Sequence, residues 1–324
     1  MSPFLKRLMR LIPSYRTLEV RKSQLIGERD ALLGQLAVLK HERELLTQWV
    51  PFYAPAHYYC PLPSRTEIAD AFARGGFGPP FGGIDLNDAE QFARLERFVG
   101  YYPEQPFPEE PAANRRYHLH NPSYPAYDGV VLYSMLREAR PRRIIEVGSG
   151  FSSAAMLDLN DLMFGRSIEL TFIDPDMERL KKLLRAGDDG RVNLIERRVQ
   201  DVPLETFSVL GENDVLFIDS SHVSKVGSDV NWLFFNVLPV LAPGVLIHIH
   251  DITGNFEYPR DWFDEGRAWN EQYLLRAFLM HNTSYRIEFF STWLWIYREQ
   301  FIKERMPACA AGGGGQIWLR KLVK

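Results

Sequence analysis

The sequence predicts an α/β fold in which a mostly parallel β-sheet is covered on both faces by helices. Short apolar runs alternate with segments of helical periodicity between residues 142 and 280. A polar or acidic residue follows each run, which is typical of repeated βα units whose strands end at one common edge. The chain has 324 residues, 46% of them apolar, and can therefore bury a substantial core.

The centre of this pattern is residues 142–153, which predict a strand, a tight turn and the start of a helix. Gly148 and Gly150 lack a Cβ atom, so the chain can turn sharply and a ligand can lie against the backbone. The first turn of the helix offers unpaired N–H groups. Such a turn suits a nucleotide-like ligand. Taken alone, it is equally compatible with a plain connection between a strand and a helix.

The remaining elements follow in order along the chain. Helices are predicted at 88–99 and 130–139 ahead of the central strand, and at 177–185, 229–241 and 269–280 after it. Further strands are predicted at 167–174, 192–196, 214–219, 244–251, 285–290 and 316–320. Between the last two strands, the four glycines 312–315 predict a flexible tip or turn.

Residues 1–50 form a separate helical unit in this interpretation. Residues 3–12 mix apolar and basic side chains and are compatible with an anionic membrane surface, although a frayed helix end is the favoured alternative. From residue 18 onward, leucines recur every seven residues, with two further apolar residues on the adjoining seam; these are Leu18, Leu25, Leu32, Leu39 and Leu46, with Leu36 and Val50. Residues 18–50 therefore predict a coiled-coil-like helix that joins a second copy or a partner. The alternative is a long helix packed on its own domain.

Residues 51–130 are rich in proline and aromatic side chains, and residues 131–324 form the predicted main domain. Tyr117, Tyr124 and Tyr127 stand just ahead of the main domain, among many hydrogen-bonding groups. We interpret residues 51–130 as a lid or substrate-facing extension; the alternative is a segment that wraps the surface.

Composition narrows the class of protein. The formal net charge of −3 gives no basic excess of the kind that nucleic-acid binding needs. Cys60 and Cys309 are far apart and fit neither a disulfide framework nor a metal-ligand spacing, so reduced thiols are expected. No run approaches the roughly 20 apolar residues of a membrane span, and no secretory signal is present. We therefore expect a cytoplasmic protein, with weak membrane association through residues 3–12 left open.

The motifs resemble those of a known family. The run from Glu146 to Gly150, followed by Asp174, Asp201 and Asp219 after successive strands, is similar to the ordered motifs of the class I S-adenosylmethionine-dependent methyltransferases. More narrowly, residues 217–222 and 247–252 resemble the bacterial methyltransferase-domain-24 group. The resemblance covers roughly residues 130–324. It implies a Rossmann-like sheet of seven strands, of which the last is antiparallel, with S-adenosylmethionine as the cofactor.

The resemblance also implies roles for residues of the turn. The turn, with Ser149 and Ser152, would pass under the methionine part of the cofactor, and Glu146 would lie close to its amino end. Phe151 departs from the pattern, because many members carry a third glycine there.

The family's strand-end acids would bind the rest of the cofactor. Asp174 would accept hydrogen bonds from both ribose hydroxyls, a task that suits a carboxylate with two oxygens. Asp201 would meet the adenine amino group, and Asp219 would line the same site. Plain solvated carboxylates at strand ends are the alternative.

A second set of residues predicts a metal and a base. Asp219, His250 and Asp251 end neighbouring predicted strands, and this set resembles the metal site of catechol-type O-methyltransferases with a histidine in place of an oxygen ligand. The predicted cation is therefore magnesium or, because imidazole is present, manganese. His222 falls where those enzymes carry a lysine base and is the candidate proton acceptor. His248 is expected to face the opposite side of the strand from His250 and to be packed in the core.

The predicted function is methyl transfer from S-adenosylmethionine to a hydroxyl of a small molecule, with a sugar or polysaccharide-related acceptor suggested by the subgroup. Aromatic and acidic residues are expected to form the acceptor pocket: Tyr117, Tyr124, Tyr127, Glu257, Tyr258 and Trp262. One alternative is a non-catalytic scaffold that keeps the fold. The other is a nicotinamide-dependent oxidoreductase, which the absent third glycine and the reversed final strand pair disfavour.

Overall fold

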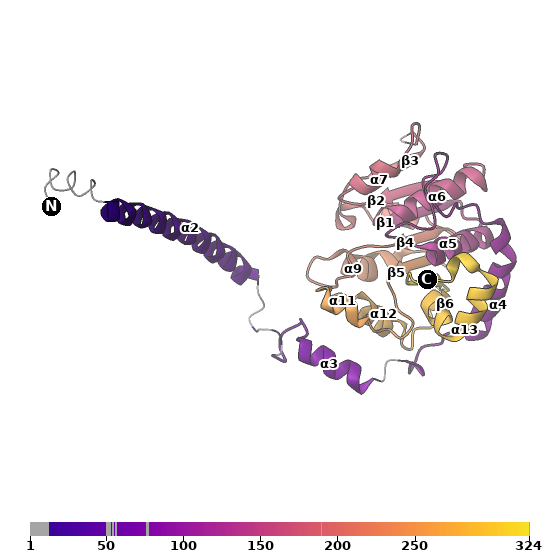
Figure 1. Cartoon of the computed structure of the whole chain (residues 1–324). Helices are drawn as coiled ribbons and strands as arrows, with labels where there is room; N and C mark the ends of the chain where they lie inside the picture. The colour runs from indigo at the N-terminus through magenta and orange to yellow at the C-terminus, as the bar shows by residue number, and fades with distance from the viewer. Residues whose placement is uncertain are drawn as a thin grey trace. The chain divides into compact units, whose positions relative to one another are not determined.

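The computed structural model describes residues 13–49, 53, 55, 57–75, 78–188 and 190–323. The chain divides into two compact units, Met1–Ala71 and Phe72–Lys324. The second unit contains the sheet and the helices around it (Figure 1).

The sheet has seven strands in the order β3-β2-β1-β4-β5-β7-β6. They are β1 (Arg143–Val147), β2 (Glu169–Ile173), β3 (Val192–Ile195), β4 (Val215–Ile218), β5 (Leu246–His250), β6 (Tyr285–Phe290) and β7 (Gln316–Lys321). Neighbouring strands from β3 to β5 pair in parallel, and β7 runs antiparallel to both β5 and β6. The predicted fold class is confirmed. The strand order reverses between β1 and β4, which is where open α/β sheets bind ligands.

Strand β1 is preceded by helices α3 (Arg65–Arg74), α4 (Asp88–Tyr101) and α5 (Ala126–Ala139). The helices that connect the strands are α6 (Phe151–Leu162), α7 (Glu178–Leu183), α8 (Glu205–Ser208), α9 (Asp229–Trp232), α10 (Leu238–Val240), α11 (Arg260–Asp264), α12 (Glu271–Leu279) and α13 (Ser291–Arg305). A π-helical turn, Leu233–Val237, joins α9 to α10, so residues 229–240 form one helical stretch as predicted.

Helix α13 lies where the sequence predicted only a link between the last two strands. Its first turns are aromatic and β-branched, a composition typical of strands. The backbone leaves helical geometry at Arg298 (φ −136°), so the periodicity is interrupted. Trp293, Leu294 and Ile302 are nevertheless buried in the core. Tertiary packing therefore decides the conformation here against local propensity.

The central strands are buried, as expected for parallel strands covered on both faces. On β5, His248 is fully buried and stacks on Phe217 with a ring separation of 3.7 Å. Its ring lies 5.7 Å from that of His250, with only 22° between the two planes. The prediction that the two histidines face opposite sides was wrong, because residues two apart on a strand point the same way. The expected packing of His248 in the core is what the structure shows.

The first unit contains one long helix, α2 (Pro13–Trp49). The leucines of the heptad that the structure describes are exposed, with exposed fractions of 67% for Leu18, 49% for Leu25, 64% for Leu32 and 61% for Leu39. Val50, the side chain of Leu46 and the predicted amphipathic segment at residues 3–12 lie outside the described residues. Among the helices described, none is long and apolar enough to cross a membrane.

A buried ion cluster fixes the segment that leads into α5. The Arg116 guanidinium donates to Asp158 on α6 at 2.7 Å and to Asp188 at 2.6 Å. The second oxygen of Asp158 accepts the backbone N–H groups of Arg116 and Tyr117. The chain ahead of α5 is therefore held against the helix that follows the glycine turn.

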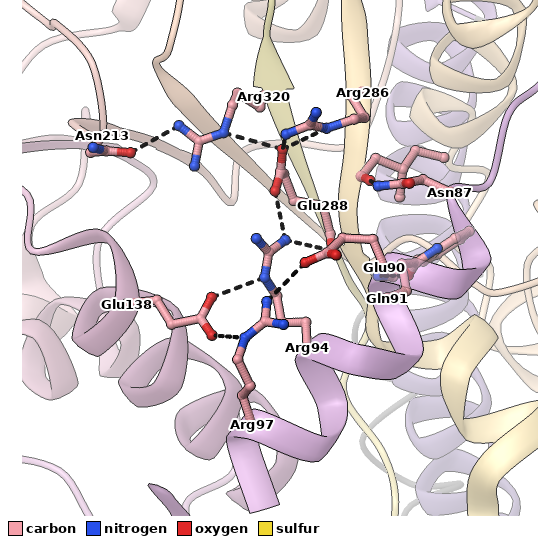
Figure 2. Close-up of polar contacts among 12 residues, drawn as sticks. Asn87, Glu90, Gln91, Arg94, Arg97, Glu138, Asn213, Arg286, Glu288 and Arg320 are labelled. Carbon is pink, nitrogen blue, oxygen red and sulfur yellow. Dashed lines mark hydrogen bonds and ion pairs between the residues drawn. The ribbon is translucent and has the colours of Figure 1, made fainter. Parts of the chain in front are cut away.

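A second cluster, drawn in Figure 2, joins α4 to the far edge of the sheet. The buried carboxylate of Glu288 on β6 accepts from Arg94 of α4 at 2.6 Å, from Arg286 at 2.7 Å and from Arg320 of β7 at 3.1 Å. Arg94 also donates to Glu138 on α5. Burial alone would raise the pKa of Glu288, but Arg94 and the other two guanidiniums outweigh burial and hold it below its ordinary value.

We expect Glu288→Gln to destabilise the fold by about 3 to 5 kcal/mol, because three guanidiniums would lose their buried counter-charge. Urea denaturation followed by circular dichroism measures this change. The effect should be full above the ordinary pKa of 4.5 and shrink as the pH falls below it, since the depressed pKa stabilises only the ionised carboxyl. The control is Glu90→Gln, which removes a half-exposed partner of Arg97 and should cost under about 1 kcal/mol. Equal losses in the two variants would contradict the assignment.

Candidate active site at the strand ends

A cavity of about 570 Å³ opens at the carboxyl ends of β1, β4 and β5. A second cavity of about 410 Å³ adjoins it and shares Gly148, Asp174 and Asp219 in its lining. Most of the predicted site residues line the first cavity: Gly148, Ser149, Gly150, Ser152, Asp174, Asp219, His222, His250 and Asp251. Glu146 and Asp201 line neither.

The glycine turn is built by a close approach of two strand ends. Gly148 has a φ of 89°, and a Cβ atom there would overlap the carbonyl oxygen of Asp219. One oxygen of Asp174 accepts the N–H of Ser149 at 2.8 Å, and the other accepts the N–H of Asp176 at 2.8 Å. The carboxylate of Asp174 is thus oriented by the backbone at the point where both cavities meet.

Glu146 lies beneath the turn and is fully buried. Its two oxygens accept hydrogen bonds from the hydroxyls of Ser152, at 2.5 Å, and of Ser153. The Ser153 hydroxyl also accepts the N–H of Gly150 at 3.0 Å. Burial raises the pKa of Glu146 to about 8. Its location supports the start of α6 from inside and differs from the predicted place beside the cofactor, because its side chain points to the face that α6 covers.

Asp201 lies outside the cavities as well. Its carboxylate is half-exposed and pairs with Arg198 at 2.8 Å, which lowers its pKa. The lining at this end comes instead from Arg198, Val199 and Gln200, just before it in the chain. The short turn after β3 points Asp201 toward a neighbouring cation and away from the site.

The ends of β4 and β5 bring two acids and a histidine together. Asp219, His222 and Asp251 each offer one potential metal-ligand atom, and these three atoms lie within 4.8 Å of one another. The Nε2 atom of His222 is 3.4 Å from a carboxylate oxygen of each acid. His222 (φ 59°) and Asp251 (φ 55°) both hold left-handed backbone conformations, which are strained for residues with a Cβ. That strain is tolerated where it directs both side chains to one point.

A second histidine completes the group. The Nδ1 atom of His250 lies 3.5 Å from Asp219 and 3.6 Å from Asp251. Each histidine turns its other ring nitrogen to a buried acid: His222 contacts Glu271 at 2.9 Å, and His250 contacts Asp128 at 3.2 Å. No sequence motif marks Glu271, which comes to the site from the first turn of α12.

These contacts set the charges. Burial alone would lower the pKa of His222, but Asp219 and Glu271 outweigh it and raise it to about 10. In the same way, the surrounding carboxylates raise the pKa of His250 above its ordinary value against the effect of burial. Burial would raise the pKa of Asp219, and the two histidines instead hold it below its usual range. Without a bound cation, His222 is therefore protonated near neutral pH and must lose that proton before it can act as a base.

Of the residues predicted to form the acceptor pocket, Tyr124 and Trp262 line the cavity. Tyr117 and Tyr127 are buried in the core and donate their hydroxyls to backbone carbonyls, so their prediction was wrong. Tyr258 is buried behind Trp262, against which its ring stacks.

Glu257, which was also predicted for the acceptor pocket, accepts the hydroxyl of Tyr273 and lies outside both linings. Arg179, Arg267 and Trp269 line the first cavity, although no sequence motif marks them.

Comparison with known proteins identifies the family of this domain. The sequence model of a methyltransferase domain family matches residues 145–252, from within β1 to just past β5. A protein of Archaeoglobus fulgidus described as uncharacterized is 33% identical over 168 residues, which are 50% of this chain and 75% of that protein. The chain belongs to the class I S-adenosylmethionine-dependent methyltransferases.

Solved methyltransferase structures are also similar to this methyltransferase. The SAH-bound methyltransferase PaMTH1 of Podospora anserina is 16% identical, with a TM-score of 0.40, over 80% of this chain and 97% of that chain. The O-methyltransferase TomG from Streptomyces achromogenes, in complex with SAM, is 15% identical, with a TM-score of 0.39, over 71% of this chain and 90% of that chain.

The different locations of Asp174 and Asp201 predict different effects on cofactor binding. We expect Asp174→Asn to weaken S-adenosylhomocysteine binding by about 10- to 100-fold, the range for a lost charge-assisted hydrogen bond. Asp201→Asn should bind as the wild type does, since its carboxylate faces Arg198. Titration calorimetry measures both affinities, and thermal melts check that both variants fold. Weaker binding by the Asp201 variant alone would reverse the assignment.

Proposed function

We propose that this methyltransferase transfers the methyl group of S-adenosylmethionine to a hydroxyl oxygen of a small molecule, with the help of a divalent transition metal. The observation that carries the proposal is the cluster of Asp219, His222 and Asp251, with His250 beside it, on the rim of the cavity. The cluster adjoins the glycine turn, so an acceptor there would lie close to the cofactor.

The residues present fit the cofactor. Asp174 offers a carboxylate at the junction of the two cavities, where a ribose would be bound. Gly148 and Gly150 leave the backbone of the turn uncovered on the cavity side. Gln200 and Arg198 offer polar groups in the second cavity. S-adenosylmethionine supplies an electrophilic methyl group on a sulfonium, and the chain's contribution is to hold the acceptor oxygen in line with it.

The residues also fit a cation. Two carboxylates and two imidazoles offer oxygen and nitrogen donors, and imidazole suits manganese, iron, cobalt or zinc better than magnesium. Each imidazole is backed by a buried carboxylate, Glu271 or Asp128, an arrangement common around metal-bound histidines. A divalent cation supplies positive charge that favours the ionised form of a nearby hydroxyl.

The contacts of His222 favour metal binding over the predicted role as a base. Carboxylates face both of its ring nitrogens, so the ring has no free acceptor nitrogen to turn toward a substrate. As a ligand, His222 would join Asp219 and Asp251, and His250 would complete the set. In the absence of metal catalysis, His222 remains the candidate base, and the following test separates the two roles.

We expect the metal-free protein to bind Mn²⁺ and Co²⁺ at least tenfold more tightly than Mg²⁺, and Asp251→Asn to lose that binding. Calorimetry and the absorption spectrum of bound cobalt measure this, independently of activity. In the presence of a chelator, transfer of labelled methyl to a panel of hydroxylated rings should fall about 100-fold or more. The reason is that a cation stabilises the ionised hydroxyl in the transition state by several kcal/mol. Full transfer in chelator would exclude the metal and leave His222 as the base.

A scaffold role is the alternative from another class, and the exposed heptad leucines of α2 favour an interaction function for that helix. We propose that α2 pairs with α2 of a second copy. The four described leucines recur every seven residues along one stripe of α2, and such a stripe is buried when two copies align. Since Arg29 occupies the adjoining seam and Gly27 weakens the helix, the pairing would be moderate.

Sedimentation of the full chain tests the pairing. Leu25→Glu with Leu32→Glu should shift the protein from dimer toward monomer, because two acids would face each other across the seam. Val20→Glu places the same change on the outward face of the helix and should leave the mass unchanged. A monomeric wild type would remove the proposal without affecting the enzyme.

A further inference from the structure

The wall of the cavity beyond His222 is aromatic and carries one guanidinium. Trp262 and Trp269 both line the cavity, with ring centroids 5.2 Å apart and planes at 75°. Tyr258 stands behind them, at 5.8 Å from Trp262 and 6.1 Å from Trp269. The two indoles therefore form a rigid corner whose position is fixed from the protein interior.

Arg267 completes this corner. Its guanidinium carbon lies 4.9 Å from the Trp262 ring and 5.2 Å from the Trp269 ring. Its backbone N–H donates to the carbonyl of Trp262 at 2.9 Å, which closes the turn that carries both side chains. A guanidinium stacked on aromatic faces keeps its N–H edge available for an anion.

The ion pair that Arg267 forms with Glu265 is weak. Glu265 accepts from one terminal nitrogen at 2.7 Å, but its side chain is 54% exposed. Exposed ion pairs contribute little, because water solvates both charges. One carboxylate also uses only part of the five N–H groups of a guanidinium. Arg267 can therefore bind an anion inside the cavity as well.

The corner has a fixed relation to the proposed reaction centre. The Trp269 ring lies 4.4 Å from the ring of His222 and 5.2 Å from the guanidinium carbon of Arg267. The Trp269 indole thus lies between His222 of the acid and histidine cluster and the guanidinium of Arg267. A molecule that lies along this wall would present one end to Asp219 and His222, and the other end to Arg267.

From this geometry we infer that the acceptor is a ring compound with a hydroxyl at one end and an anionic group, a carboxylate or a phosphate, at the other. The inference rests on the proposed function, since it identifies the substrate class of the same site. Indole faces bind the apolar face of a sugar or aryl ring, and the guanidinium binds the anion in a forked contact. The two ends of the site differ in charge, so they also orient the ring with its hydroxyl toward the cofactor.

Binding to the protein loaded with S-adenosylhomocysteine and Mn²⁺ tests the class. The probes are pairs that differ only by the anion: 3,4-dihydroxybenzoate with catechol, and glucuronate and glucose 6-phosphate with glucose. We expect an anionic member to bind about tenfold or more tightly than its neutral partner, the low end for a charge-assisted contact. Comparing these pairs distinguishes an aryl acceptor from a sugar acceptor, and a carboxylate from a phosphate.

Variants assign the preference to Arg267. Arg267→Gln should reduce the ratio of anionic to neutral affinity to near one, while S-adenosylhomocysteine binds as before. Glu265→Gln breaks the same surface ion pair and should keep the ratio, which separates loss of the acceptor contact from loss of that pair. Arg260→Gln, an exposed arginine on the same segment, is the neutral control.

The results distinguish failure of the acceptor class from failure of the proposed function. Equal binding of charged and neutral rings, or no binding of any anionic ring while the cofactor product binds, would overturn the acceptor class alone. Failure of S-adenosylhomocysteine to bind would overturn the proposed function itself.

Discussion

The contact between the ends of β1 and β4 is the constraint on which the site depends. Gly148 approaches the carbonyl of Asp219 so closely that any side chain would overlap it, and its N–H donates to Ile173 at the end of β2. Three strand ends therefore meet within one turn. Because Asp219 is both the residue that Gly148 touches and a member of the cluster with His222 and Asp251, the glycine turn and that cluster share one rim. A wider separation of these strands would place the turn and the cluster on different surfaces.

Electrostatics determines what the rim can hold. Asp219 and Asp251 lie side by side, and two protonated histidines balance them when no cation is present. A buried acid behind each histidine, Glu271 or Asp128, keeps its ring oriented toward Asp219 and Asp251. Because carboxylates face both of its ring nitrogens, His222 offers no free nitrogen to a substrate, which is why the proposal makes it a metal ligand.

Sequence patterns could predict the sheet, the glycine turn and the acids that end β2 and β4, because burial and strand order follow from apolar periodicity and turn chemistry. They could not predict the partners of each acid. Glu146 lies within β1 and Asp201 lies in the turn after β3, where Glu146 accepts from Ser153 and Asp201 pairs with Arg198, so neither carboxylate lines the cavity. Likewise, nothing local marks Glu271, whose role comes from a contact 49 residues distant in the chain.

The C-terminal glycines show how far the site extends beyond its motifs. The sequence predicted a flexible tip there, yet Gly314 lines the cavity, and a side chain on it would overlap the carboxylate of Asp128. Asp128 in turn binds His250 at 3.2 Å and the Gln316 amide at 2.7 Å. The missing side chain of Gly314 therefore lets an acid from α5 reach the end of β5. Through that acid, β7 holds His250 beside Asp219 and Asp251, which gives Gly314 a packing role at the site itself.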